Sequence, residues 1–358
     1  MPIDGNKVRA VVYSQAIGDA LGLPAEFKSA KAIRTLWPDE SWPSVYQETR
    51  RLGSCNWKAG EWSDDTEQAI CVLNAYLQGV GVGEHVSVGK DYGGKVRDPA
   101  EHIDLRLVAQ QFLLWAASNG RGMGNHTAKV FEHPFFTLAP TVAATDVWEQ
   151  SGRKAAPNGA VMRTAYVGIL RPWDLDWTAE VAAEVAATTH ADPRCIASAV
   201  AVSVAIATLV CGQDIYTAIG NALLFGGKHD PEVREWIGKP LSELKLDEGM
   251  DGPRGTTFPP IGYTYKAMGA GFWAIIEFTR RDEAMYDDLY EDRFADVLRM
   301  VIRAGGDTDT NGAVAGAMLG ALVGAENLPE HLVEGLNPKS ELDRLADEVV
   351  RLHGLAQQ

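Results

Sequence analysis

The sequence contains little cysteine. Its 358 residues include four, and no two of them form a Cys-x-x-Cys pair. They stand far apart in the chain, at Cys55, Cys71, Cys195 and Cys211. Such spacing gives no support to a thiolate metal site and is typical of buried or free thiols in a reducing compartment. We therefore expect a cytoplasmic protein.

Basic residues are also in short supply. Lys and Arg together number 33 against 48 acidic residues, which gives a formal net charge of −15. General nucleic-acid binding depends on neutralising phosphates with basic side chains, so no such binding is expected. A small phosphate-bearing ligand is still compatible with this charge, because a bound metal or a helix N-terminus can supply local positive charge.

Long apolar runs are not evident where a signal or membrane segment would need them. The first residues, MPIDGNKVRAVVYSQAIGDALG, lack the architecture of a cleavable signal, and Gln15, Gly18 and Asp19 interrupt their apolar run. The uncharged run Gly312–Ala325 is shorter than the roughly 20 residues that a membrane helix needs. These features predict no membrane association.

Helical periodicity dominates what is present. Hydrophobic residues make up 46% of the chain, enough for a substantial core, and alternation at period two is scarce. Apolar residues recur at three-to-four spacing in Ala10–Leu21, Thr66–Leu77, Leu105–Ala117, Trp177–Thr188, Ile196–Leu209, Tyr263–Phe278, Phe294–Ile302, Asn311–Val323 and Leu342–Leu352. The sequence predicts an all-α fold.

Three irregular regions separate these segments. Phe27–Trp62 holds four tryptophans among Pro, Gly and charged residues, which favours a long ordered loop with a small hairpin. Gly79–Pro99 is rich in glycine, and Gly226–Pro260 is the best candidate for a flexible insertion. Helical segments of the same kind lie on both sides of each region. We therefore predict one compact, orthogonal multi-helix domain over residues 1–358, with an insertion at 226–260.

Two stretches carry most of the chemistry. In EWSDDTEQAI, Ser63, Asp64 and Asp65 precede an amphipathic run. Ser or Asp in that place commonly caps a helix, and acids in a first turn suit the helix dipole. A cap accounts for one acid, whereas three consecutive oxygen side chains followed by Thr66 point to a further role.

The second stretch, GGDTDTNGAVAGAMLGALVGA, has the same order of glycines, acids and helix. Asp307, Asp309 and Thr310 precede glycines at 312, 316, 320 and 324, which a continuous helix would place on one face. Glycine inside a helix costs up to about 1 kcal/mol relative to alanine. The repeated spacing therefore indicates a close approach to another helix, which would hold the acids in a fixed place.

Two acidic helix starts are mutually repulsive unless cations lie between them. Carboxylates and hydroxyls are the ligands of Mg²⁺ or Mn²⁺, and no thiolates or paired imidazoles indicate zinc. We interpret the two motifs as halves of one site for divalent cations. The glycines of NGRGMGN superficially suggest a nucleotide loop, but no strand precedes them, so a dinucleotide fold is not favoured.

With these motifs the chain resembles the ADP-ribosylglycohydrolase family, which includes the dinitrogenase reductase-activating glycohydrolases. The resemblance runs through nearly the whole chain in order, in GDALGLPAEF, WSDDTEQ, GRGMGNHT, SGRKAAPNGAVMR, TTHADPRC, GYTYKAMGAGFWA and GGDTDTNGAVAGAMLGA. It implies an all-α fold of that type, two divalent cations (Mg²⁺ or Mn²⁺), and hydrolysis of an N- or O-glycosidic bond at C1″ of ADP-ribose.

The resemblance also implies roles for individual residues. One ion would be bound by Ser63, Asp64 and Asp65, and the other by Asp307, Asp309 and Thr310, with Asp309 bridging. Glu26 matches a mobile glutamate beside the metals. Asn158, Gly159, His190 and Tyr263 match positions that contact the ligand. Considered without the family, Asn158–Gly159 is an ordinary turn, His190 a helix cap, and Tyr263 a core aromatic. The family often has Gly where Pro157 stands.

Three functions follow from these observations. The first is a hydrolase that releases ADP-ribose from a modified protein, nucleic acid or small molecule, with Asp64 or Asp65 activating water and Glu26 as a gate or second base. The second is a catalytically weak protein that binds ADP-ribose or another NAD metabolite. The third, a phosphoesterase using the same metals, ranks last because neither Asp motif stands near an Arg cluster.

Overall fold

The computed structural model describes residues 3–50, 56–81, 102–248, 260–283 and 289–356. The N-terminal part contains α1 (Gly5–Gly22), the 3₁₀ helix η1 (Leu23–Ala25), β1 (Lys28–Ser29), α2 (Ala30–Leu36), β2 (Thr49–Arg50), β3 (Asn56–Trp57) and α3 (Asp64–Gly81). The middle contains α4 (Leu105–Ser118), α5 (Asn125–Phe131), α6 (Pro140–Gln150), α7 (Val161–Thr164), α8 (Val167–Leu170), α9 (Leu175–Ala187), α10 (Pro193–Val210), α11 (Ile215–Gly226), α12 (Val233–Trp236) and α13 (Leu241–Leu244). The C-terminal part contains α14 (Thr264–Glu283), α15 (Tyr290–Arg303), β4 (Gly305–Gly306), α16 (Thr308–Val323), the 3₁₀ helix η2 (Ala325–Asn327), α17 (Glu330–Glu334) and α18 (Lys339–Ala356).

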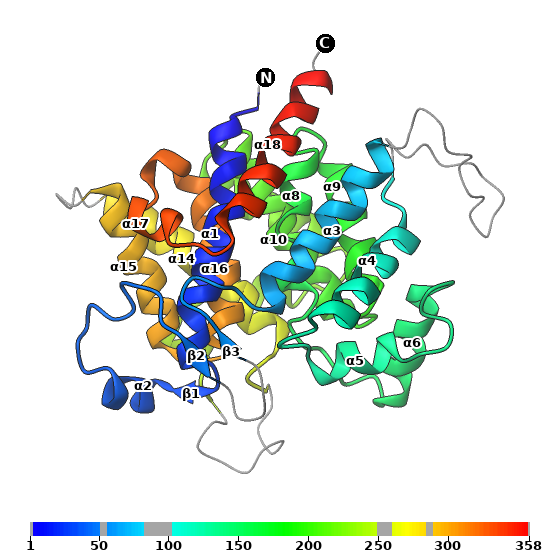
Figure 1. The fold of residues 1–358 in the computed structure, drawn as a ribbon, viewed down its shortest axis with the longest axis horizontal. Helices are drawn as coiled ribbons and strands as arrows, with labels where there is room; N and C mark the ends of the chain where they lie inside the picture. Colours follow the sequence, from blue (N-terminus) through cyan, green and yellow to red (C-terminus); the bar gives the residue numbers. More distant parts are fainter. Residues whose placement is uncertain (1–2, 51–55, 82–101, 249–259, 284–288, 357–358) are drawn as a thin grey trace.

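This architecture confirms the predicted all-α class. Each of the nine predicted helical segments lies in a helix, except that Tyr263 and Thr188 fall just outside α14 and α9. The tryptophan-rich region contains the expected hairpin, since β2 pairs antiparallel with β3. Figure 1 shows α1 and α16 at the centre, with the other helices around them.

The helix with the repeated glycines packs against α1, and the two form the most extensive helix–helix contact among the described residues. A Cβ at Gly312 would lie 2.4 Å from the carbonyl oxygen of Gly18, and one at Gly316 would lie 2.1 Å from that of Ser14. Alanine at these positions would overlap the neighbouring backbone, so glycine is a steric requirement here. Gly324 differs from the prediction, because it ends α16 with φ +84° and does not share the glycine face.

Two other expectations differ from the structure. Residues 226–248, the first part of the expected flexible insertion, form α12 and α13 and bury Val233, Leu244 and Leu246, while residues 249–259 lie outside the described residues. The predicted region Gly79–Pro99 is described only as far as the end of α3. The prediction of one domain stays a prediction.

One helix of the described part, α10, is long and apolar enough to cross a membrane, and 83% of that window is buried inside the protein. Residues 195–213, within and just after this helix, carry no charge and form a longer uncharged run than Gly312–Ala325. A core helix passes the same test of length and composition, and α10 packs between α9, α11 and α16.

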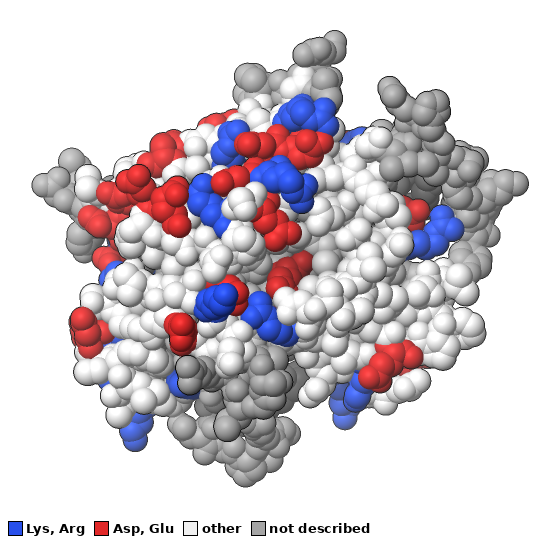
Figure 2. Space-filling model, in the orientation of Figure 1, with Lys and Arg blue, Asp and Glu red and all other residues white. Residues whose placement is uncertain are grey.

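The described cysteines Cys71, Cys195 and Cys211 are free, and Cys55 lies outside the described residues. On the face drawn in Figure 2, Lys and Arg side chains lie next to Asp and Glu side chains. The negative net charge is therefore not spread as one uniform acidic field over that face.

Candidate metal centre

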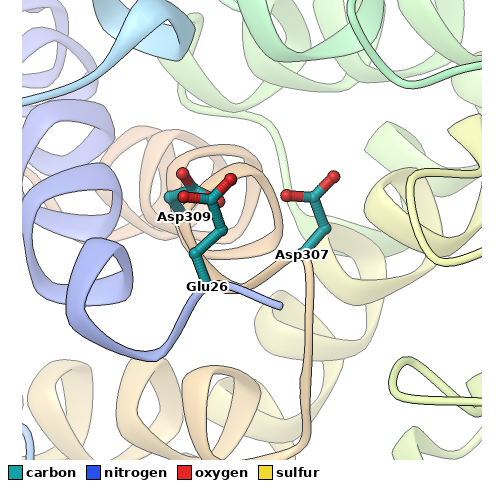
Figure 3. Close-up of side chains that lie close together, drawn as sticks. All are labelled: Glu26, Asp307 and Asp309. Carbon is teal, nitrogen blue, oxygen red and sulfur yellow. The ribbon is translucent and has the colours of Figure 1, made fainter. Parts of the chain in front are cut away.

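Three carboxylates from two distant parts of the chain meet at the start of α16. Glu26, Asp307 and Asp309 each offer an oxygen, and these oxygens all lie within 4.8 Å of one another. Figure 3 shows Glu26 and Asp309 close together with Asp307 beside them, and the carboxylates point to the same side. The structure therefore brings Glu26 of GDALGLPAEF next to residues 307–310 (the DTDT motif), as the resemblance implied.

A short strand pairing explains how Glu26 reaches the other two acids. β1 pairs antiparallel with β4, so that Lys28 faces Gly306, and the amide of Phe27 donates to the carbonyl of Gly306 at 2.8 Å. Gly306 has φ +84°, and a Cβ there would lie 2.1 Å from the carbonyl oxygen of Leu246. Glycine therefore allows the chain to turn here, immediately before Asp307.

Asp307 stands at the N-cap position of α16, but its side chain makes no capping hydrogen bond. Its Oδ2 instead accepts a hydrogen bond from the side-chain amide of Asn158 at 2.9 Å, and both residues are buried. The backbone amide of Asn158 donates to the carbonyl of Gly262 at 2.9 Å, which fixes the turn. Asn158, predicted to contact the ligand, thus orients a predicted metal ligand in this structure.

The motif Ser63–Asp64–Asp65 (the SDD motif) is held in place by Asp19, which was not among the predicted site residues. The buried carboxylate of Asp19 on α1 accepts hydrogen bonds from the amides of Ser63 and Thr66 at 3.0 and 3.1 Å, and from the Thr66 hydroxyl at 2.7 Å. Asp19 therefore caps α3 from another helix. This leaves the Ser63 hydroxyl to donate to Oδ2 of Asp65 at 2.8 Å. The only signal in the sequence is an acid inside an apolar helix.

Asp65 connects the two acidic motifs electrostatically. Burial raises the pKa of its carboxyl well above the ordinary value, and the charges of Asp19, Asp64 and Asp307 raise it further, while the Thr310 hydroxyl lowers it in part. Its Oδ1 is buried without a hydrogen-bond partner. A buried carboxylate crowded by like charges is stabilised by a nearby cation.

Asp64 lies at the same helix start but faces other partners. Its Oδ2 accepts a hydrogen bond from Gln68 at 3.2 Å. A Cβ at Gly122 would lie 2.3 Å from its Oδ1, so the glycine in NGRGMGN lets that loop approach the carboxylate. Asp64 and Asp65 are not members of the tight set formed by Glu26, Asp307 and Asp309.

The remaining predicted ligand contacts are all buried. A Cβ at Gly159 would lie 3.0 Å from Nε2 of His190, which is 1% exposed. Tyr263 is 3% exposed and packs against Trp236 with ring centroids 5.5 Å apart. In this structure His190 and Tyr263 are therefore buried, and their contact with a ligand stays a prediction.

Comparisons with known proteins agree with the resemblance. A model of the ADP-ribosylglycohydrolase family matches residues 2–358. An uncharacterised protein of Archaeoglobus fulgidus is 27% identical over 352 residues, which cover 97% of each chain. The uncharacterised protein YegU of Escherichia coli is 26% identical over 172 residues, or 46% of this chain and 42% of that protein. A solved structure described as an ADP-ribosylglycohydrolase-related protein complex has a TM-score of 0.63 and 21% identity, covers 98% of both chains, and shows the same fold.

Proposed function

Because the chain belongs to the ADP-ribosylglycohydrolase family, we propose that it is a divalent-metal-dependent hydrolase that cleaves the glycosidic bond at C1″ of ADP-ribose. The product is free ADP-ribose, released from a modified protein, nucleic acid or small molecule. The observation that carries this proposal is the set of three carboxylates at the start of α16, whose oxygens lie within 4.8 Å of one another.

The residues present suit divalent cations. All the side chains gathered at the two motifs offer oxygen, which Mg²⁺ and Mn²⁺ prefer. The buried Oδ1 of Asp65 has no hydrogen-bond partner, and burial, followed by the surrounding negative charge, raises the pKa of that carboxyl well above its ordinary value. Two ions would be held by the predicted ligands Ser63, Asp64, Asp65, Asp307, Asp309 and Thr310. When bound, they would neutralise the carboxylates, orient the ribose hydroxyls and polarise a water molecule.

The protein's own residues supply the proton transfer and the orientation. Asp64 or Asp65 would accept a proton from water, the water oxygen would form the bond to C1″, and the bond to the leaving group would break with proton transfer to that group. Glu26, between η1 and β1, would act as a gate or second base. Asn158 would keep the Asp307 carboxylate in position by its hydrogen bond at 2.9 Å.

The test is release of ADP-ribose from a panel of defined linkages. Purified protein would be given arginine-, serine-, nucleobase- and acetyl-ester-linked ADP-ribose with Mg²⁺, with Mn²⁺ or with a chelator. We expect metal-dependent release from at least one linkage, its loss in Asp309→Asn, and its retention in Glu180→Gln, which removes an exposed charge on α9. No release from any linkage, with ADP-ribose bound in calorimetry, would instead support the binding protein.

A further inference from the structure

A buried cation lies behind the site, and neither the metal ligands nor the proposed chemistry accounts for it. Arg163, on α7, is 0% exposed, and its guanidinium lies 4.7 Å from the ring centroid of Phe112. Burial lowers the pKa of Arg163 to about 9, so the group is still charged at neutral pH. An arginine so fully buried requires specific partners, because an unpaired buried charge is costly.

One nitrogen of the guanidinium, Nη1, is connected to the SDD motif through Gln68; we call this connection the Asp64 arm. Nη1 of Arg163 donates to Oε1 of Gln68 at 3.1 Å. Because the side-chain oxygen of Gln68 accepts this hydrogen bond, its side-chain nitrogen faces Asp64 and donates to Oδ2 at 3.2 Å. Arg163 therefore determines which end of the Gln68 amide faces the carboxylate.

The other terminal nitrogen, Nη2, is connected to His190 through Thr189; we call this connection the His190 arm. Nη2 of Arg163 donates to the hydroxyl oxygen of Thr189, and that oxygen lies 2.6 Å from Nδ1 of His190. Arginine has no acceptor, so the hydroxyl cannot give its proton to Arg163. Among the described contacts, the acceptor left for that proton is Nδ1 of His190. If Nδ1 carried a proton instead, the hydroxyl oxygen would still accept hydrogen bonds, but the buried hydroxyl proton of Thr189 would have no acceptor among the described contacts, at a cost of about 1–3 kcal/mol.

The consequence is a defined tautomer. Burial lowers the pKa of His190 well below its ordinary value, which keeps the ring neutral. With Nδ1 accepting, Nε2 carries the proton. This Nε2 is buried without a partner and lies against Gly159, in the turn where Asn158 holds Asp307.

We propose that Arg163 is a positioning residue of the site: it directs the Gln68 amide to Asp64 and, through Thr189, fixes His190 as the Nε2–H tautomer beside the Asn158–Gly159 turn. Arg163 touches neither substrate nor metal in this arrangement. A planar fork of five N–H donors can serve both arms at once, which the single ammonium of lysine cannot. This inference rests on the proposed function, because that function is what makes the acidic motifs a metal site. Its tests measure a histidine tautomer and metal affinity without substrate, so a failure of the inference can be distinguished from a failure of the proposed hydrolysis.

The first test reads the tautomer in the folded, metal-free protein. Long-range ¹H–¹⁵N NMR spectra distinguish Nε2–H from Nδ1–H histidine, and comparison with His190→Gln assigns the signal. We expect Nε2–H for His190 in the wild type and in Thr189→Ser, which keeps the hydroxyl. Thr189→Val, which replaces the hydroxyl with a methyl group, should give a mixture of tautomers. An Nδ1–H tautomer in the wild type, or an unchanged tautomer in Thr189→Val, would contradict the claim that Arg163 fixes the His190 tautomer through Thr189.

The second test reads Mn²⁺ affinity by calorimetry. Partners that orient metal ligands typically affect affinity 10–100-fold, and we expect a loss of roughly tenfold in Gln68→Met, with the His190 tautomer unchanged. Thr189→Val should leave the affinity within about twofold. Arg163→Met should change both readouts, whereas a merely structural arginine would change only the unfolding midpoint. If Arg163→Met does not fold, Gln68→Met and Thr189→Val still decide each arm. Unchanged affinity in Gln68→Met contradicts the proposed role of Arg163 toward Asp64. A wild type that binds no Mn²⁺ contradicts the proposed metal site itself, and with it that role, while the His190 tautomer still tests the rest of the proposal.

Discussion

Replacing Gly316 with alanine should destabilise the protein, although alanine normally favours a helix. The added Cβ would lie 2.1 Å from the carbonyl oxygen and 2.9 Å from the carbonyl carbon of Ser14 on α1. Overpacking a well-packed core typically costs about 1–3 kcal/mol, and more where rigid backbone must move. The higher helix propensity of alanine offsets only about 0.5–1 kcal/mol of this loss in the free energy of unfolding. We expect a net loss of roughly 1–2 kcal/mol or more.

Gly220 in α11 provides a matched control. A Cβ at Gly220 would meet nothing within 4 Å, and the residue is exposed. Gly220→Ala should therefore stabilise the protein by about 0.5–1 kcal/mol, the opposite sign to Gly316→Ala. Urea unfolding of the two variants and the wild type measures both effects. The same sign in the two variants would refute a steric requirement at the contact between α1 and α16.

The Gly316 substitution should also affect metal binding. Displacing α16 from α1 moves Asp309, whose backbone lies 2.6 Å from where a Cβ on Gly22 would be. Mg²⁺ and Mn²⁺ sites tolerate little displacement of their ligands, so folded Gly316→Ala should bind Mn²⁺ more weakly than Gly220→Ala. Equal Mn²⁺ affinity in calorimetry would mean that the glycine contact stabilises the fold without positioning the acids.

Three further predictions follow from the site. Asp309→Asn should abolish release of ADP-ribose while leaving the urea midpoint of the metal-free protein unchanged or slightly higher, because a like charge is removed; a lowered midpoint with retained activity would indicate a capping acid. Asn158→Ala should weaken Mn²⁺ binding about 10–100-fold in calorimetry, since Asp307 loses its donor; unchanged binding contradicts that role. Burial raises the pKa of Asp19 to about 6, above its ordinary 3.8, so its contribution to metal-free stability is present below about pH 4 and is lost as pH rises through 6, on the order of 3 kcal/mol. Urea unfolding at both pH values should show a loss of stability that is smaller in Asp19→Asn than in the wild type by about that amount, because Asp65 titrates in both proteins; equal losses in the two proteins would contradict this.

Local patterns were sufficient to predict the helices and the two acidic motifs. Apolar periodicity predicted the helices because most of them bury one face, and the glycine spacing predicted a close helix contact because no other residue fits there. The sequence could not indicate that the partner is α1. Gln15, Gly18 and Asp19 appeared only as interruptions of an apolar run. In the structure Gln15 donates to the carbonyl of Asp65 at 3.2 Å, and Gly18 meets Gly312.

The parts that sequence reasoning missed depend on long-range hydrogen bonds. The cap of α3 comes from Asp19, which stands 44 residues before Ser63, so no local pattern could reveal it. Arg163 is the last residue of PNGAVMR, which looks like a turn and a helix start, and its partner Thr189 is 26 residues away. Such partners are chosen by burial, because a polar group removed from water must find a hydrogen bond wherever the fold supplies one.

The most direct measurement is a Mn²⁺ titration of the wild type, Asp64→Asn and Asp309→Asn by calorimetry, with Glu180→Gln as the charge control. We expect the wild type and the control to bind two ions per chain, and each substitution in the acidic motifs to remove or greatly weaken the binding of at least one of them. Binding that is unchanged in both Asp variants, or no Mn²⁺ binding by the wild type, would contradict the claim that the two acidic helix starts form one metal centre.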